Sequence, residues 1–335
     1  MSRLRDVPLS VLDLAPITTG TNATTALRNT RELAQHVERL GYTRFWLAEH
    51  HNMPGIASSS PAVLIGHVAD ATTTLRVGSG GVMLPNHPPL VVAEQFGTLA
   101  ALHPGRIDLG IGRAPGTDQK TARALRRTAD ALSAEDFPQQ LTELIEYFDG
   151  TSDIAAVPAV GNKPPVWLLG SSGYSAQVAG VLGLPFAFAH HFSAQNTLPA
   201  LELYRRRFKP SAVLDKPYAM VCASVVLADT TEHARWIAGP GALAFLRLRN
   251  GRPGPLPSPQ EAADHPYSDL DRMFIEERMS SQVVGDPATV DEQLAKLLDD
   301  TGADELMVTT MVYDQADRLR SYELLTELAA APVSH

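Results

Sequence analysis

Short apolar runs alternate with amphipathic stretches along almost the whole chain. The amphipathic stretches have the spacing of helices that bury one face. Eight apolar runs are short enough for strands, and they lie at residues 9–14, 45–48, 75–84, 106–112, 165–169, 186–189, 219–227 and 306–312. The helical patterns lie at residues 24–40, 60–73, 88–102, 134–148, 174–182, 198–208, 286–300 and 318–330. This alternation predicts an α/β protein whose strands close into a (β/α)8 TIM barrel.

The chain between the seventh and eighth predicted strands is longer than one connecting helix requires. An insertion is expected at about residues 240–282, and it contains the Pro- and Gly-rich segment 251–259. Long loops are uncommon without a function, so this segment is either a lid over the barrel mouth or a plain surface insertion. Asp286 is a suitable N-cap and Gly302 a suitable stop for the last barrel helix. The whole chain, residues 1–335, is expected to form one domain.

Composition and charge exclude several classes of protein. Hydrophobic residues make up 44% of the chain and charged residues 19%, which is typical of a globular protein and excludes wholesale disorder. The net charge of −9 argues against a nucleic-acid partner, because phosphate binding needs clustered Lys and Arg. Neither a signal peptide nor an apolar run long enough for a membrane span is found, so no membrane association is expected. Cys222 is the single cysteine, which fits a reducing compartment, and we predict a cytoplasmic location.

The sequence Glu49-His50-His51-Asn52 follows the second predicted strand directly. Barrel enzymes carry their catalytic residues at such strand ends. An imidazole, with an unperturbed pKa of about 6.5, can accept or donate a proton, although histidines here can also be plain polar residues of the rim. Glu and His are also ligands for zinc or iron, with a third ligand from His87, His190 or His191. Because successive side chains of a strand point to opposite faces, His50 and His51 are not expected to bind one ion, and no metal is predicted.

Other small or polar residues occur at or near predicted strand ends. Gly80-Gly81 lies within the third strand, where a glycine pair indicates a β-bulge. The run Ser171-Ser172-Gly173 lies between the fifth strand and its helix, where hydroxyls, loop amides and a helix N-terminus can bind an anion. An ordinary N-cap is the alternative for Ser172. The run His190-His191-Phe192 ends the sixth strand and either faces a substrate or belongs to the rim.

Four motifs, in the same order along the chain, resemble those of the luciferase-like flavin monooxygenases. They are Phe45–Asn52, Val77–Pro85, Gly105–Arg113 and Pro165–Ser175, and the resemblance covers nearly the whole chain. It implies a two-component enzyme in which a separate flavin reductase supplies FMNH2, O2 is the co-substrate, and a C4a-peroxyflavin hydroxylates or epoxidises a small organic molecule. Within the family, the Glu-His-His-Asn motif is similar to that of a single-chain group. This closer resemblance implies an aromatic polyketide as the substrate and a role in antibiotic biosynthesis.

The resemblance also implies roles for individual residues. It places His50 beside the flavin, where it influences the lifetime of the oxygenated intermediate, and it places Glu49 and His51 on either side of His50. Gly80-Gly81 matches a non-proline cis peptide below the flavin ring, and Asn86 is expected at the polar edge of the flavin. The FMN phosphate is expected at residues from two loops, namely Arg113, Ser171, Ser172, Gly173, Tyr174 and Ser175.

Two rival functions stay open at this point. No Rossmann or Walker A motif is present, so the reduced flavin is expected to come from outside. The first rival is a deazaflavin-dependent oxidoreductase that transfers a hydride without oxygen. The second is a flavin-binding protein without turnover. The presence of His50 and Arg113 argues against this second function. Gly112 stands where the light-emitting luciferase subunit has a reactive cysteine, which argues against bioluminescence.

The resemblance finally implies a homodimer. The expected interface consists of the helices at residues 62–73 and 88–102, with Ala93, Phe96 and Ala100 among its apolar residues and Glu94 placed for a polar contact. Helices that pack on the barrel of the same chain would show a similar pattern of small and apolar residues.

Overall fold

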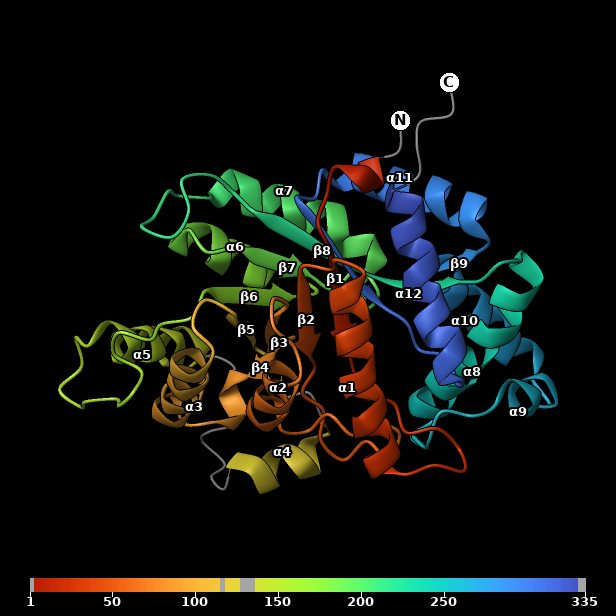
Figure 1. Cartoon of the computed structure of the whole chain (residues 1–335), viewed down its shortest axis with the longest axis horizontal. Helices are drawn as coiled ribbons and strands as arrows, with labels where there is room; N and C mark the ends of the chain where they lie inside the picture. Colours follow the sequence, from red (N-terminus) through yellow and green to blue (C-terminus); the bar gives the residue numbers. More distant parts are fainter. Residues whose placement is uncertain (1–2, 115–117, 127–135, 331–335) are drawn as a thin grey trace.

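The computed structural model of the protein is a barrel of parallel strands surrounded by helices (Figure 1). It describes residues 3–114, 118–126 and 136–330. The strands are β1 Leu9–Asp13, β2 Arg44–Leu47, β3 Arg76–Ser79, β4 Val82–Met83, β5 Ile107–Gly112, β6 Val166–Gly170, β7 Phe186–Phe188, β8 Ala219–Leu227, β9 Val283–Gly285 and β10 Glu305–Thr309. The order β1-β2-β3-β5-β6-β7-β8-β10 returns to β1 through parallel pairs, so the sheet closes. The predicted (β/α)8 TIM barrel is confirmed.

Helices follow most of the barrel strands. The α-helices are α1 Ala23–Arg39, α2 Pro61–Asp70, α3 Pro89–Leu102, α4 Gln119–Arg126, α5 Phe137–Asp149, α6 Gly173–Leu182, α7 Thr197–Arg207, α8 Thr231–Arg249, α9 Pro259–Ala263, α10 Asp269–Ser280, α11 Pro287–Thr301 and α12 Gln315–Ala330. Short 3-10 helices are η1 Arg3–Arg5, η2 Leu84–Asn86 and η5 Ala194–Asn196. Among the described residues, no helix combines the length and the apolarity needed to cross a bilayer.

Local sequence signals account for the ends of the last barrel helix. The Asp286 side chain accepts a hydrogen bond from the backbone N of Thr289, and Pro287 occupies the first position of α11. Gly302 follows the helix in the left-handed conformation with φ of 55°. The predicted cap and stop are therefore confirmed.

The apolar core has two layers. The larger layer lies between the strands and the helices and contains Phe45, Phe96 and Phe186. The smaller layer fills the barrel interior and includes Trp46 and Trp167, whose ring centroids lie 5.2 Å apart at an interplanar angle of 79°. Because side chains fill the barrel interior, a ligand can bind only at an end of the barrel.

A network of buried charges closes the end of the barrel where the strands begin. The Arg44 guanidinium lies 2.7 Å from Asp108 Oδ2 and 3.0 Å from Glu305 Oε1. The Arg76 side chain also contacts Asp108, at 2.5 Å, and the Tyr218 hydroxyl donates to Glu305 Oε2 at 2.9 Å. These pairs satisfy the buried charges at this end, so the opposite end is available for a binding site.

The third barrel strand differs from its prediction. A continuous strand over residues 75–84 was expected, but β3 and β4 are separated by a cis peptide bond between Gly80 and Gly81. The expected cis peptide is confirmed, and the simple bulge is not observed. Packing requires glycine at position 81, because a Cβ there would lie 2.7 Å from the backbone O of Gly110, whereas a Cβ on Gly80 would lie 2.5 Å from Leu12 Cδ1, the end of a flexible side chain.

One predicted helix is only partly described. The start of the helix expected at residues 134–148 lies outside the described residues, and α5 is described from Phe137. The short helix α4 was not predicted.

The insertion begins earlier than the predicted residue 240. The helix α8 runs through Pro240, and β9 pairs with the end of β8, so the added structure extends from Thr231 to Gly285. Figure 1 shows α8, α9 and α10 gathered on one side of the barrel beside α12. The Pro-rich segment 251–259 is attached to the loop after β1, where Leu256 N donates to Ile17 O at 2.8 Å.

Candidate active site

The loop after β2 is fixed at the rim where the barrel strands end. The backbone N of Ala48 donates to Asp13 O at 3.0 Å, and the backbone N of His50 donates to Ser58 O at 2.9 Å. The Ser58 hydroxyl donates in turn to Ala48 O at 2.5 Å. These bonds link β1, β2 and the start of α2, so Glu49, His50 and His51 are held at defined positions on the rim.

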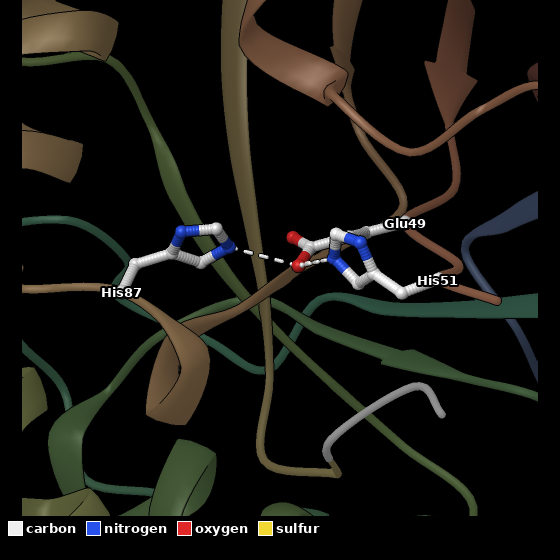
Figure 2. A group of neighbouring side chains, drawn as sticks. All are labelled: Glu49, His51 and His87. Atoms are coloured by element: carbon white, nitrogen blue, oxygen red, sulfur yellow. Dashed lines mark hydrogen bonds and ion pairs between the residues drawn. The ribbon is translucent and has the colours of Figure 1, made fainter. Parts of the chain in front are cut away.

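Glu49 is the centre of a hydrogen-bonded cluster on this rim. Its side chain is fully buried, and its Oε1 atom lies 2.8 Å from His51 Nε2 and 2.8 Å from His87 Nε2. Figure 2 shows the two imidazoles approaching this one oxygen from opposite sides. The backbone N of Met83 donates to Oε2 at 3.0 Å, and Asn86 Nδ2 lies 3.5 Å from Oε1. The cluster therefore joins the β2 loop to β4 and η2.

The cluster keeps Glu49 ionised. Burial raises the pKa of the carboxyl group, but the hydrogen bonds from His51 and His87 and the backbone bond from Met83 outweigh burial and lower the pKa to about 2. The carboxylate accepts hydrogen bonds only, so each imidazole must present its Nε2 proton to it. Glu49 thus fixes the tautomer and the orientation of both rings.

The same three side chains have the spacing of a metal site. The ligand atoms of Glu49, His51 and His87 all lie within 4.8 Å of one another. The argument from strand alternation does not apply to this set, because β2 ends at Leu47 and the residues after it lie in a loop. Each imidazole nevertheless bonds to the carboxylate, so the polar groups are satisfied without an ion. The absence of a metal stays a prediction.

His190 and His191 form a second group of histidines on the rim, directly after the end of β7. Electrostatic contributions from Arg278, His190 and His50 lower the pKa of His191, so these side chains lie near the end of β7. His190 Nδ1 lies 2.8 Å from Thr197 Oγ1. The expected place of His50 beside the flavin, with Glu49 and His51 on either side of it, stays a prediction.

His191 is uncharged at neutral pH. Burial is the main cause that lowers the pKa of its imidazole, to about 4, and the nearby positive groups lower it further. A hydrogen bond to Cys222 O, 3.1 Å from Nδ1, opposes this shift only in part. Because a carbonyl oxygen only accepts, Nδ1 carries the proton and Nε2 is an acceptor in the neutral ring.

The residues expected at the phosphate end lie on neighbouring loops. The guanidinium carbon of Arg113, after β5, lies 4.1 Å from the ring centroid of Tyr174 in the first turn of α6. Ser172 precedes α6 but its side chain makes no capping hydrogen bond, so the ordinary N-cap is not observed. Ser171 and Ser172 are exposed, whereas Ser175 is 5% exposed. A guanidinium, exposed hydroxyls and a helix N-terminus are the groups that bind a phosphate.

Sequence reasoning missed two residues of the rim. His87 was considered only as a metal ligand, and Arg278, on α10 of the insertion, was not considered at all. Arg278 donates from Nη1 to the backbone O of His191, across 87 positions of the sequence. No local sequence pattern predicts this contact between α10 and the residues after β7. Asn86 Nδ2 lies 3.5 Å from Glu49 Oε1, and the expected place of Asn86 at the polar edge of the flavin stays a prediction.

The closed parallel barrel, with its polar side chains gathered where the strands end, defines the protein as an enzyme of the TIM-barrel class. The sequence model of the luciferase-like monooxygenases matches residues 7–305. The chain therefore belongs to the luciferase-like monooxygenase family, and the protein is a flavin-dependent monooxygenase.

Individual relatives agree with this assignment. The chain is 50% identical to a luciferase-like monooxygenase of Escherichia coli K12 over 97% of both chains. It is 34% identical to the N-acetyl-S-alkylcysteine monooxygenase of Bacillus subtilis, over 97% of this chain and 99% of the relative. The crystal structure of apo-MsnO8 superposes with a TM-score of 0.90 at 40% identity, covering 96% of this chain and 98% of the other.

Two more distant structures share the fold. One is the oxygenating constituent of 3,6-diketocamphane monooxygenase from Pseudomonas putida in complex with FMN, with a TM-score of 0.74 at 19% identity, covering 97% of this chain and 98% of the other. The other is the coenzyme F420-dependent tetrahydromethanopterin reductase of Methanopyrus kandleri, with a TM-score of 0.68 at 15% identity, covering 96% and 97%. The fold therefore occurs with FMN and with F420.

Proposed function

We propose that the protein uses FMNH2 and O2 to hydroxylate or epoxidise a small organic substrate, and that a separate flavin reductase supplies the FMNH2. The observation that carries this proposal is the arrangement of an anion-binding group, Arg113 with Tyr174, and two histidine groups on one rim of the barrel. The absence of a nicotinamide-binding motif in the sequence supports an external source of reduced flavin. The lone cysteine supports our placing this partnership in the reducing cytoplasm.

The residues of the rim fit FMN by their chemistry. The phosphate would be held by Arg113 and by the start of α6, where Ser171, Ser172 and Gly173 offer hydroxyls and backbone N–H groups. Tyr174 packs against the Arg113 guanidinium and so limits its conformational freedom. Bound reduced FMN supplies the electrons that activate O2, so that one oxygen atom enters the substrate and the other leaves as water.

The histidines of the rim have different roles in this proposal. His50 stands in the group near His191 and is our candidate for exchanging a proton with the reacting centre. His51 and His87 are held by the Glu49 carboxylate, which keeps their Nε2 protons in place and the β2 loop attached to β4. We therefore assign His50 the catalytic role and assign Glu49 and His51 positioning roles.

Residues 251–259 are our candidate for excluding water from the rim. Leu256 is buried, and the segment pairs with the loop after β1 through Leu256 N to Ile17 O and Thr19 N to Leu256 O, both at 2.8 Å. Exclusion of water suppresses unproductive loss of the activated oxygen. The attachment to the β1 loop supports a cover that is held at the barrel mouth.

The organic substrate belongs to one of two proposed chemical classes. The Glu-His-His-Asn motif is similar to that of the single-chain group and favours an aromatic polyketide, which would place the enzyme in antibiotic biosynthesis. The relative named N-acetyl-S-alkylcysteine monooxygenase makes an S-alkyl thioether the second class. Both classes contain an electron-rich centre that an activated oxygen can attack.

We also propose a homodimer through α2 and α3, although the residues that support it differ from those expected. Ala93 and Phe96 are fully buried within the protomer, so they are not available to a partner as expected. Val63, Val91 and Leu102, on the same two helices, are 72%, 39% and 68% exposed. These exposed apolar side chains support an interface there.

The test is anaerobic titration with FMNH2, followed by an oxygen pulse while the flavin absorbance is recorded. We expect binding and a long-lived transient spectrum that decays faster in His50→Ala. The exposed His67→Ala variant is the control and should behave like the wild type. No binding of FMNH2, with binding of reduced F420, would favour the deazaflavin rival; binding without a transient would favour a flavin-binding protein without turnover.

A further inference from the structure

The insertion places a guanidinium next to the histidines at the end of β7. Arg278, in the last turn of α10, donates from Nη1 to the backbone O of His191. Its guanidinium carbon lies 4.7 Å from the ring centroid of Phe245 on α8. The aromatic ring and the carbonyl fix the guanidinium at the rim, although α10 belongs to no barrel unit.

Among the described residues, this guanidinium has no carboxylate partner. Within residues 3–114, 118–126 and 136–330, no Asp or Glu side chain forms an ion pair with Arg278. Its Nε atom is buried and has no hydrogen-bond partner. Burial alone lowers the pKa of Arg278, and no negative group raises it. In contrast, Arg44 and Arg318 each contact a buried carboxylate.

The surroundings add positive rather than negative potential. Arg278, His190 and His50 all lower the pKa of His191, and burial lowers the pKa of His190. The neutral His191 ring uses Nδ1 on the Cys222 carbonyl. Arg278 is therefore a partly buried cation near the end of β7, and no acidic side chain among the described residues pairs with it.

A guanidinium whose buried Nε has no hydrogen-bond partner is costly in free energy, so it is retained where a ligand completes it. A guanidinium matches a carboxylate, whose two oxygens can each accept one of its N–H groups. We propose that Arg278 binds a carboxylate group of the organic substrate at the end of β7. This inference deepens the proposed function and rests on it for the identity of the ligand as the substrate.

The phosphate of the flavin is the competing source of an anion. It has its own candidate site at Arg113 and Tyr174, on the loops after β5 and β6. Arg278 lies beyond these loops, at the residues that follow β7. Because Arg113 lies after β5 and Arg278 lies on α10, one molecule can present a phosphate to Arg113 while another presents a carboxylate to Arg278.

The experiment uses benzoate as a carboxylate probe and benzamide as its uncharged counterpart. Calorimetric titration of the full chain, without flavin, gives the affinity for each probe. We expect benzoate to bind the wild type, and to bind Arg278→Met about ten- to a hundredfold more weakly, which is the usual effect of losing hydrogen bonds between charged groups. Benzamide should bind weakly to both. Arg278→Lys keeps the charge and guards against a folding defect, and it should show an intermediate affinity.

Matched variants distinguish a carboxylate bound at Arg278 from a carboxylate bound at the phosphate site of Arg113. Arg272→Met changes an exposed arginine on the same helix and should leave benzoate binding unchanged. If Arg113→Met abolishes benzoate binding while Arg278→Met retains it, the carboxylate occupies the phosphate site and the proposal is overturned. Equal affinities for benzoate and benzamide, or no saturable benzoate binding to the wild type, overturn it as well. Because no turnover is measured, failure of the monooxygenase proposal leaves this result unaffected, and anaerobic FMNH2 titration tests that proposal separately.

Discussion

The guanidinium carbon of Arg113 lies 4.1 Å from the ring centroid of Tyr174. Arg113 follows β5 and Tyr174 lies in the first turn of α6, so the contact joins two adjacent loops of the rim. A cation over an aromatic ring gains roughly 0.5–1 kcal/mol at an exposed site. The stacking holds the guanidinium close to the start of α6, where we expect the FMN phosphate.

This contact predicts unequal effects of two substitutions on flavin binding. Arg113→Met removes the charge and should weaken FMNH2 binding about ten- to a hundredfold. Tyr174→Leu removes only the stacking and should weaken it about two- to fivefold. Anaerobic fluorescence titration measures both affinities, with the exposed Arg206→Met as the control. An unchanged affinity in Arg113→Met would place the phosphate elsewhere.

The Glu49 carboxylate predicts a loss of stability in acid. Its folded pKa of about 2 lies below the ordinary value of 4.5, so its contribution is present above pH 4.5 and is lost as the pH falls towards 2. Glu49→Gln should therefore lower the free energy of unfolding at neutral pH by about 3 kcal/mol, and the difference from the wild type should shrink in acid. Urea unfolding at a series of pH values measures it. If the unfolding free energies of the wild type and Glu49→Gln change in parallel with pH, the lowered pKa of Glu49 is contradicted. The exposed Glu292→Gln serves as the control.

His191 predicts a second pH dependence at higher pH. Its folded pKa of about 4 lies below the ordinary 6.5, so the unfolded chain binds this proton first as the pH falls. Stability should therefore decline between pH 6.5 and 4, by up to about 3 kcal/mol, and His191→Gln should flatten the decline. Unfolding curves across this range test it, with the exposed His67→Gln as the control. An equally steep decline in His191→Gln would assign the dependence to other groups.

The sequence was sufficient for the barrel because each element carries its own local signal. The strand β8 was predicted with its exact bounds at residues 219–227, and Asp286 and Gly302 marked the ends of α11. The third strand failed at Gly80-Gly81, because close contact with Leu12 and Gly110, which only the folded barrel creates, decides the backbone there. Local patterns do not contain such contacts.

The site was predictable only in part, for a related reason. The position of Glu49, His50 and His51 after a strand placed them on the rim, but the loop decides which side chains meet. Glu49 and His51 bond to each other, and His87, which follows η2, bonds to the same carboxylate oxygen. The contact between Arg278 and His191 depends on how the insertion packs, which no spacing in the sequence reveals.

The cluster of Glu49, His51 and His87 predicts no dependence on a metal ion. Its imidazoles already donate to the carboxylate, so an ion would have to displace two hydrogen bonds. We expect metal analysis of the purified protein to find far less than one ion per chain, and prolonged dialysis against a chelator to leave flavin binding and turnover unchanged. Near-stoichiometric zinc or iron that is lost in His87→Ala would show instead that the three side chains form a metal site.

The buried pair of Arg318 and Asp13 predicts a large effect on stability. The guanidinium lies 2.5 Å from Asp13 Oδ1, and both side chains are almost fully buried. Thr30 Oγ1 and the backbone N of Ala15 also donate to this carboxylate, at 2.6 and 2.9 Å, so it links β1, α1 and α12. Removing one partner of a buried pair leaves an uncompensated charge, so Arg318→Met should cost about 3–5 kcal/mol.

The neighbouring arginine on α12 offers a matched comparison. Arg320 also forms ion pairs, with Asp229, Glu323 and Glu327, but its side chain is 39% exposed. Arg320→Met should therefore cost less than about 1 kcal/mol, because solvent screens exposed pairs. The free energy of unfolding in denaturant measures both variants. If Asp13→Asn with Arg318→Met costs less than the sum of the two single changes, the pair acts as a unit; if Arg318→Met costs no more than Arg320→Met, burial is not what makes this ion pair matter.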